Sequence, residues 1–373
     1  MDILSILAFL TTTIWTIYAI QITIFSIISF GYKSINKPVK AKNIEFIVVS
    51  IASSSVKNSL YEVVEHLKSF DREINILTDE GAELIPNLKQ DFPHCSFVIV
   101  PKSFQCSAVA KGRAIEYFIR NKVNANTWYA ILDDDSYPLD DKFLYEISHR
   151  EQLGYVAANG LLYPRPGKNV YTYLLDHFRY LDDVTFFRAC QGTLHTPLCG
   201  FHGELLIIKG STLLEIGFNR KSITEDFSFG TEIVKKKYKT WSSQTKVSIK
   251  SPNNFTDLIK QRARWYKGIL LDLKTAPHKV QFVMGVHLFR STFSFAGSFL
   301  IMIFWIFLAL LGYNYIAFNP LFIAGTIYWI VGSFILPKVS WKHKFMVLPL
   351  SIVEAISPYY ALKAKGFQVI DKN

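Results

Sequence analysis

A long run without charged residues near the start of the chain limits its possible folds more than any other feature. Residues 3–32 contain no Asp, Glu, Lys or Arg, whereas about 20 apolar residues suffice for a membrane-spanning helix. The run is too long for the apolar part of a signal peptide, and no basic segment or small-residue cleavage site surrounds it. A buried helix of this length normally has a polar face. We therefore predict an N-terminal transmembrane helix within residues 1–32.

A second uncharged run covers residues 291–337. Turn-forming residues from Gly312 to Pro320 divide it, which predicts a transmembrane helical hairpin with spans near 294–311 and 321–336. A weaker apolar run at 345–362 contains Glu354 and has lysines on both sides. It is typical of an interfacial helix, within a tail at 338–373.

Basic residues orient the predicted spans. Four lysines lie between residues 33 and 42, and three lie between 338 and 344. Because such loops stay on the cytoplasmic side, we expect the N-terminus outside, with a domain at 33–290 and the tail in the cytoplasm. The predicted location is the cell membrane or an ER-like membrane.

The net charge of +11 suits contact with anionic lipid or with a polyanionic ligand such as a nucleotide diphosphate. We expect no nucleic-acid partner, because no recognition motif for one is present. The four cysteines form no CxxC pair, which favours free cytosolic thiols.

The domain at 33–290 begins with alternating strand and helix patterns. Buried strands are predicted at 44–49, 74–77, 97–100 and 128–132, with helices at 56–70 and 108–120. This alternation predicts an α/β fold with a mostly parallel sheet flanked by helices. Ligands bind beyond the carboxyl ends of such strands, where Asp79 and Asp133 follow. Residues 170–200 are predicted as helix and then loop.

An acidic triplet, Asp133-Asp134-Asp135, follows the fourth predicted strand. Alternate residues of an extended segment point the same way, so Asp133 and Asp135 can converge on a divalent cation and on diphosphate oxygens. The alternative is a solvated turn, or a cap for a helix starting near Asp140.

A second acidic segment, Thr224-Glu225-Asp226, precedes a predicted helix at 227–234. Either carboxylate can act as a general base on an attacking hydroxyl. The alternative is a helix-capping box.

The segment Gln261-Arg262-Ala263-Arg264-Trp265 lies on a helix predicted to start after Pro252, with Asn253 or Asn254 as its cap. Gln261, Arg264 and Trp265 share one side of it. An arginine fork can hold a diphosphate, and an indole can pack on a sugar. The alternative is a basic helix facing lipid headgroups.

Two further residues are candidates for donor contacts. Lys111 follows the third predicted strand, where it either meets phosphate or is solvated. His202 lies in a glycine-flanked loop, Cys199–Gly203, whose backbone can approach a ligand closely. The alternative for His202 is a structural role.

Together, these segments resemble the membrane-bound family 2 glycosyltransferases of the cellulose-synthase-like group. That family carries a nucleotide-contacting Asp, a DxD, a TED and a QxxRW motif, which are matched in order by Asp79, Asp133–Asp135, Thr224–Asp226 and Gln261–Trp265. The resemblance implies a GT-A fold with membrane helices at both ends. Residues 50–55 depart from the family's usual nucleotide loop, being largely serine.

A closer resemblance, over most of residues 44–270, is to Egghead-type β-mannosyltransferases. It rests on Ile99–Lys102 with Gln105, Ala110–Ala114, Asp182-Asp183, and Ser251-Pro252 with Gln261–Gly268. It implies GDP-mannose as donor and Asp226 as base. It further implies that Asp133 and Asp135 serve the diphosphate and Mn²⁺ or Mg²⁺, and that Gln261, Arg264 and Trp265 line the acceptor and diphosphate side.

We therefore predict an inverting, metal-dependent glycosyltransferase on the cytoplasmic membrane face. It would move mannose from GDP-mannose to a lipid-linked acceptor, because three spans are too few for a polymer channel. The acceptor would be a polyprenyl (dolichyl-type) phosphate, a glycan carried on one, or a glycolipid. The alternatives are a UDP-sugar transferase making a glucosyl lipid or short polysaccharide, a non-catalytic membrane scaffold, and a basic membrane-surface protein.

Overall fold

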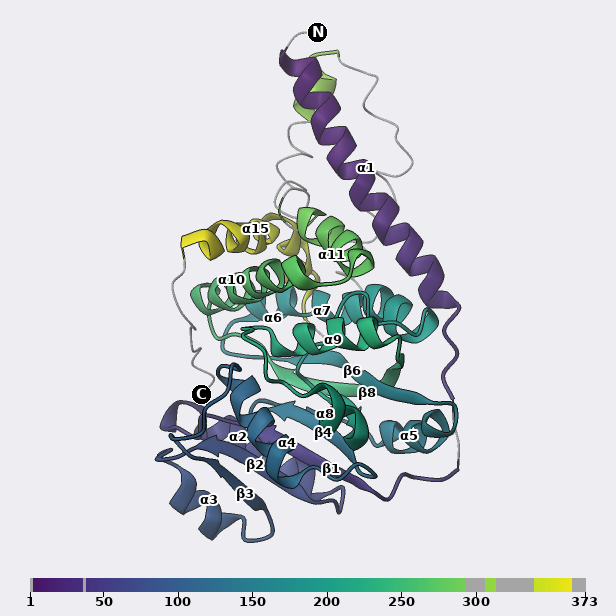
Figure 1. Ribbon diagram of the computed structural model, residues 1–373. Helices are drawn as coiled ribbons and strands as arrows, with labels where there is room; N and C mark the ends of the chain where they lie inside the picture. The colour runs from purple at the N-terminus through teal and green to yellow at the C-terminus, as the bar shows by residue number, and fades with distance from the viewer. Residues whose placement is uncertain (1–2, 36–37, 291, 293–305, 313–338, 364–373) are drawn as a thin grey trace.

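The computed structural model describes residues 3–35, 38–290, 292, 306–312 and 339–363. A twisted sheet with helices on both faces occupies the lower part of Figure 1, and a layer of helices lies above it. The predicted α/β class is therefore confirmed.

Four strands from the N-terminal part of the chain form a parallel ladder. Strand β1 (Ile44–Val49) pairs with β2 (Ile74–Asp79) and with β4 (Trp128–Asp133), and β3 (Ser96–Val100) pairs with β2. The sequence predicts all four, because each is a short run of apolar residues. Since the strands are parallel, the aspartates that end β2 and β4 lie at the same edge of the sheet.

The other half of the sheet is mixed. It contains β5 (Ser136–Pro138), β6 (Tyr155–Arg165), β7 (Leu206–Lys209) and β8 (Lys239–Lys250), and the described strands are ordered β3-β2-β1-β4-β7-β6-β8-β5. Strand β7 is antiparallel to β4 and to β6, β8 is parallel to β6, and β5 is antiparallel to β8. The sheet thus has more antiparallel pairing than the sequence predicts.

Helices cover both faces of the sheet. They are α2 (Lys57–Lys68), α3 (Ile85–Asp91), α4 (Lys111–Lys122), α5 (Lys142–Gln152), α8 (Gly210–Ile216) and α9 (Glu225–Lys236), with the 3₁₀ turn η1 (Ser54–Val56). A second 3₁₀ turn, η3 (Leu273–Thr275), lies in the upper helical layer. Phe46 of β1 packs in the core on the α2 side with Leu60, and Ile47 packs on the α4 side with Phe118. This alternation is expected for a strand covered on both faces.

The upper helical layer comes from distant parts of the chain. Its elements are α6 (Val170–Asp176), α7 (Phe178–Asp182), the π-helix η2 (Asp183–Thr193), α10 (Phe255–Asp272), α11 (His278–Arg290), α14 (Trp341–Phe345) and α15 (Val347–Lys363). Helix α15 packs along α10 and against α6 (Figure 1). The predicted helix followed by a loop at 170–200 is mainly helical, including the π-helix.

The N-terminal run forms one helix, α1 (Ile3–Phe30), which packs against η2 and α11 and extends away from the sheet (Figure 1). Within the described ranges, no helix is both long and apolar enough to cross a membrane. Most of the predicted hairpin at 291–337 lies outside the described residues. The transmembrane spans and the cytoplasmic tail stay predictions, whereas the free state of the four cysteines is confirmed.

Candidate active site

A cavity of about 460 Å³ lies at the carboxyl ends of β1, β2 and β4. Its wall includes the last residue of each of these strands, and the upper helices contribute the opposite side. All of the candidate residues from the sequence line it: Asp79, Lys111, Asp133, Asp135, His202, Glu225, Asp226, Gln261, Arg264 and Trp265. The fold therefore brings together residues that lie up to half the chain apart.

Lys111 and Asp133 form an ion pair in the cavity wall. The Nζ atom of Lys111 lies 2.5 Å from Oδ1 of Asp133 and donates a second hydrogen bond to the carbonyl of Gly203 at 3.2 Å. Burial lowers the pKa of Lys111, but Asp133 and the carboxylates of Glu225 and Asp226 outweigh it and raise the pKa. Lys111 is thus a fixed positive charge among carboxylates, and not a solvated lysine.

The two other residues of the acidic triplet are almost buried. Ser50 donates a hydrogen bond from Oγ to Oδ2 of Asp134 at 2.8 Å, and Arg165 donates to the carbonyl of Asp135 at 2.9 Å. The triplet does not cap a helix, because α5 begins later, after Asp141. Within the part of the chain that the structure describes, no group of three or more His, Cys, Asp or Glu side chains is arranged to hold a metal ion.

Thr224 occupies the N-cap position of α9 but does not cap the helix through its side chain. Its side chain makes no capping hydrogen bond and instead donates to Oδ2 of Asp272, at the end of α10, at 3.0 Å. Ser222 donates to the same oxygen at 2.6 Å. The capping-box alternative is therefore wrong. The end of α10 holds the turn that leads into Glu225 and Asp226.

The two carboxylates in the first turn of α9 have altered acidity. Burial raises the pKa of Asp226, the charge of Glu225 raises it further, and although Lys111 opposes both, the value reaches about 8. Burial also raises the pKa of Glu225, against the effect of Lys111. The main-chain N–H of Phe227 donates to Oδ1 of Asp226 at 2.8 Å. A carboxyl with this acidity can exchange a proton near neutral pH.

Gly203 lies between the acidic triplet and α9. A methyl group in place of its hydrogen would lie 3.5 Å from Oδ2 of Asp226, 3.7 Å from Oδ2 of Asp133 and 2.7 Å from Nζ of Lys111. Carboxylates from β4 and α9 and the amine of Lys111 thus all lie close to one point. A substrate bond held there can meet a proton acceptor and a positive charge together.

Helix α10 forms the wall opposite the strands. It is capped by Asn254, whose Oδ1 accepts from the N–H of Asp257 at 2.9 Å, which confirms one of the two predicted caps. Arg262 donates to Oε1 of Gln261 at 2.8 Å. The interpretation of this helix as one that only faces lipid headgroups is wrong, because Gln261 and Trp265 line the cavity.

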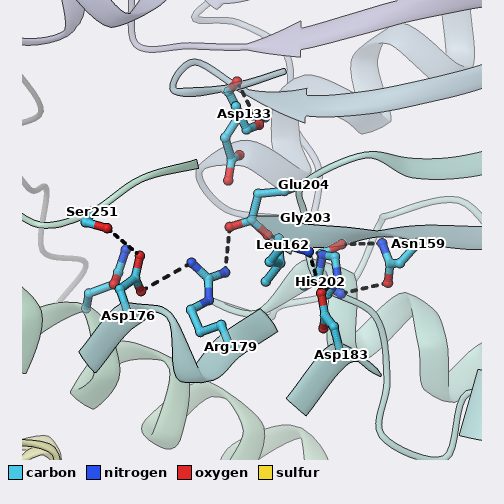
Figure 2. A network of polar contacts seen from close by, with 12 residues as sticks. Asp133, Asn159, Leu162, Asp176, Arg179, Asp183, His202, Gly203, Glu204 and Ser251 are labelled. Carbon is cyan, nitrogen blue, oxygen red and sulfur yellow. Dashed lines mark hydrogen bonds and ion pairs between the residues drawn. The ribbon is translucent and has the colours of Figure 1, made fainter. Parts of the chain in front are cut away.

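His202 belongs to a charged network that the sequence does not reveal (Figure 2). Its Nε2 lies 3.4 Å from Asp183 and its Nδ1 lies 3.5 Å from Glu204. Burial lowers the pKa of His202, but the two carboxylates outweigh it and raise the pKa to about 9. Glu204 also accepts from Nη2 of Arg179 at 2.8 Å. The ring of His202 is therefore held by protein carboxylates.

Asp79 is more exposed than the other candidates. Its carboxylate pairs with Arg113, whose Nη1 lies 2.5 Å from Oδ1, and Arg113 also donates to the carbonyls of Pro101 and Phe104. The structure therefore places Asp79 at an open part of the cavity wall.

The side of the cavity next to the upper helices is largely apolar. It is lined by Phe178, Phe186, Phe187, Met284, Leu288 and Pro358. The cavity thus joins a charged end, where the strands finish, to an apolar end below α11 and α15. Such a division suits a ligand with a polar group and an apolar chain.

Residues 128–334 match the family model described as "Glycosyl transferase family group 2". Curated relatives include the "Beta-1,4-mannosyltransferase bre-3" of Caenorhabditis briggsae, 25% identical over 252 residues, or 65% of this chain and 51% of the relative. The "Beta-1,4-mannosyltransferase egh" of Drosophila melanogaster is 26% identical over 235 residues, or 58% of this chain and 49% of the relative. The chain spans about half the length of these relatives.

Among solved structures, the chain is similar to a mannosyltransferase, PcManGT, from Pyrobaculum calidifontis, solved in complex with GDP-Man and Mn²⁺. The TM-score is 0.59 at 13% sequence identity, and the match covers 96% of this chain and 99% of the other. At this identity, the similarity concerns the fold.

Proposed function

Because the chain belongs to glycosyl transferase family group 2, we propose that it transfers mannose from GDP-mannose to a hydroxyl group of a lipid-linked acceptor. The anomeric carbon is inverted in this reaction. The observation that carries the proposal is the approach of Asp133 and Asp226 to one point beside Gly203. Groups that can take the proton of the attacking hydroxyl and offset the charge of the leaving diphosphate are therefore close together.

In the proposed reaction, the Asp226 carboxylate takes the proton of the acceptor hydroxyl while the hydroxyl oxygen bonds to the anomeric carbon. The bond from that carbon to the diphosphate oxygen breaks, and GDP leaves with the electron pair. Lys111, already held at Asp133, stabilises the negative charge that develops on the diphosphate. Burial and then the neighbouring Glu225 raise the pKa of Asp226 to about 8, so that its ionised form is a stronger base than an ordinary carboxylate.

Mn²⁺ or Mg²⁺ is the proposed cofactor, and Asp133 and Asp135 are its proposed ligands. Both line the cavity at the end of β4, and carboxylate oxygens are the donors that these cations prefer. A bound divalent cation neutralises charge on the departing diphosphate. The solved structure of similar fold is a complex with GDP-Man and Mn²⁺, which supports the proposal.

The choice of mannose and guanosine diphosphate rests on the similar proteins. The curated relatives are named as β-1,4-mannosyltransferases, and the solved structure holds GDP-Man. We propose that Asp79 meets the nucleoside at the open part of the cavity. His202 is proposed to act on the donor side through its loop. The next residue, Gly203, has no side chain that would fill the cavity there.

A hydroxyl acceptor fits this cavity better than a polyprenyl phosphate. A phosphate is already ionised and needs no base, whereas a sugar hydroxyl does. Glu225, beside Asp226, also lines the cavity, and its carboxylate would repel a phosphate monoester. We therefore favour a glycan or glycolipid acceptor, with Trp265 packing against its sugar.

We propose that the protein works on the cytoplasmic face of the cell membrane or an ER-like membrane. The support is an exposed apolar surface on the upper helices, including Phe282 of α11, Trp341 and Phe345 of α14, and Leu362 of α15. Lys342, Lys344 and Lys363 flank it. Apolar and basic side chains in this combination favour an anionic lipid surface.

A donor screen tests this function. The full chain is incubated with Mn²⁺, a mixed lipid extract and radiolabelled GDP-mannose, UDP-glucose or UDP-GlcNAc, and the lipid product is identified by mass. We expect label to enter lipid from GDP-mannose, and not after chelation with EDTA until Mn²⁺ is added back. Transfer from a UDP-sugar would identify a different donor. Neither transfer nor donor hydrolysis from any donor would favour a scaffold, and full activity in EDTA would exclude the metal.

A further inference from the structure

Trp265 lies beside two guanidinium groups from different helices. The central carbon of Arg179, on α7, is 4.5 Å from the centre of the indole, and that of Arg262, on α10, is 4.7 Å from it. Contacts at these distances are cation–π interactions, and they are stronger when they are shielded from water. Both arginine side chains are mostly buried. The indole is therefore fixed by charges as well as by packing.

One carboxylate connects the two arginines. Oδ1 of Asp176, the last residue of α6, accepts from Nη2 of Arg262 at 2.8 Å and lies 3.7 Å from Nη1 of Arg179. Its other oxygen accepts from Oγ of Ser251 at 3.2 Å. Asp176 is only 1% exposed. Figure 2 shows Asp176 and Glu204 on either side of Arg179.

Each arginine also has a carboxylate partner of its own. Glu204 pairs with Arg179 at 2.8 Å, and Glu354 of α15 pairs with Arg262 at 3.1 Å. If the charge of Asp176 is removed, neither guanidinium is left without a carboxylate. A buried charge with no partner is strongly destabilising. Because each arginine keeps a carboxylate partner, the fold should tolerate the change. The change removes the shared carboxylate that fixes the positions of the two arginines relative to each other.

We propose that Asp176 is a positioning residue, which holds Arg179 and Arg262 against Trp265 and so orients the indole toward the acceptor. The inference rests on the proposed function, in which Trp265 packs against the acceptor sugar. Asp176 itself meets neither sugar nor nucleotide. Its effect reaches the acceptor through the two arginines, and Glu354 extends the same arrangement to α15.

The test compares Asp176→Asn with a matched control, Glu146→Gln. Glu146 is also a buried carboxylate, 3% exposed. Its carboxylate accepts a hydrogen bond from Nε1 of another indole, Trp241, at 3.2 Å. Glu146 does not line the cavity. Arg262→Lys keeps the positive charge but loses the planar guanidinium. If Asp176→Asn does not fold, Glu354→Gln takes its place, because it releases Arg262 from α15.

The first measurement reports on the indole without requiring activity. The full chain is labelled with 5-fluorotryptophan, and the resonance of Trp265 is assigned among the seven tryptophans by Trp265→Phe. We expect Asp176→Asn and Arg262→Lys to shift or broaden that resonance. Glu146→Gln should affect Trp241 instead. An unchanged Trp265 resonance in both variants would overturn the proposal.

The second measurement follows transfer from GDP-mannose at increasing amounts of the lipid extract. We expect Asp176→Asn to raise the half-saturating amount of extract about tenfold, the effect of losing a contact worth about 1.4 kcal/mol. Half-saturation by GDP-mannose should change less than twofold. Equal changes for both substrates would overturn the positioning role. Absence of transfer by the wild-type protein would refute the proposed function instead, and the fluorine spectra would still decide how Trp265 is held.

Discussion

The pKa of Asp226 differs from the one that its place at the start of a helix would by itself produce. A helix N-terminus stabilises negative charge, but burial and the neighbouring Glu225 raise the pKa of Asp226 to about 8. With this pKa, the carboxyl is mostly protonated at pH 7 and ionises as the pH rises through about 8. This is the acidity that a general base needs in order to take up a proton and return it.

Replacing Asp226 with Asn should remove the base and leave the fold intact. We expect the turnover of GDP-mannose to fall by about 10²- to 10⁴-fold, the usual contribution of a positioned base, with little change in the KM for GDP-mannose. Wild-type kcat/KM should rise with pH toward about 8. Glu232→Gln, at a partly exposed position further along the same helix, is the control. Unchanged turnover in Asp226→Asn would exclude this residue as the base.

His202 should make stability depend on pH. Its folded pKa of about 9 lies above its ordinary value, so its stabilising effect is complete below about pH 6.5 and is lost as the pH rises through 9. We expect the difference in unfolding free energy between wild type and His202→Gln to shrink by about 3 kcal/mol over this range. Urea unfolding at several pH values measures it. A difference independent of pH would show that the imidazole is neutral in the fold.

Among single residues, the sequence predicts those that line the cavity better than the charged residues that form ion pairs around it. Asp133 and Asp226 can be chosen by their place in short motifs, and both line the cavity. Asp176 and Arg179 cannot, because they lie in a mixed aromatic segment and become paired only through tertiary contacts with α10 and Glu204. The two-residue spacing of His202 and Glu204 is a local signal of the charged network around His202.

Among the elements, α10 positions the turn before the proposed base, Asp226, as well as lining the cavity. A Cβ on Gly268 would lie 2.5 Å from Cγ2 and 2.6 Å from Oγ1 of Thr224. Thr224 is also tied to Asp272, one turn further along the helix. The helix can therefore approach the turn before Asp226 closely only because residue 268 has no side chain.

Gly268→Ala should therefore push α10 away from that turn. We expect an overpacking cost of about 1–3 kcal/mol, partly offset by about 1 kcal/mol of helix propensity, together with a loss of transfer. Gly285→Ala on α11 is the control, because its new methyl group would meet no atom within 4 Å, and it should be neutral or stabilising. Thermal unfolding and transfer measure both variants. A Gly268→Ala protein as active as wild type would show that the turn does not depend on this contact.

The elements that the sequence predicts are those with a simple apolar pattern. Strands β1 to β4 are short apolar runs, and Asn254 caps α10 as expected. Strand β8 escapes prediction because its buried positions include hydroxyl residues such as Thr240, Ser243 and Thr245, which a polarity pattern assigns to the surface. The π-helix η2 has a repeat longer than that of an α-helix, so its apolar positions do not match the expected period.

For the whole molecule, the charged and apolar ends of the cavity suggest how the proposed lipid-linked acceptor would be presented. The apolar end lies below α11 and α15, and these helices carry exposed apolar side chains next to lysines. On the membrane location proposed above, a lipid tail could stay near the bilayer while its polar group reaches Asp226. The order of the motifs in the sequence does not reveal this arrangement, since it depends on the docking of helices far apart in the chain.

The exposed aromatics of α14 should contribute to membrane binding. Trp341 is 63% and Phe345 is 55% exposed, and we expect the double change to serine to weaken binding to phosphatidylserine-containing vesicles by about tenfold or more. Leu139→Ser with Leu153→Ser is the control, because these exposed leucines flank α5, away from the upper helices (Figure 1). Vesicle flotation measures both. Equal binding by the two double variants would exclude α14 as the contact surface.

The pairing of Arg262 with Glu354 joins residues 92 positions apart, and this separation has a consequence during synthesis. At about 5–20 residues per second, a ribosome needs about 5 to 20 s to travel from one to the other. For that time the nascent chain already contains the motifs of the donor side, but not the helix that completes the wall beside Trp265. The wall beside Trp265 is therefore completed only when translation reaches α15.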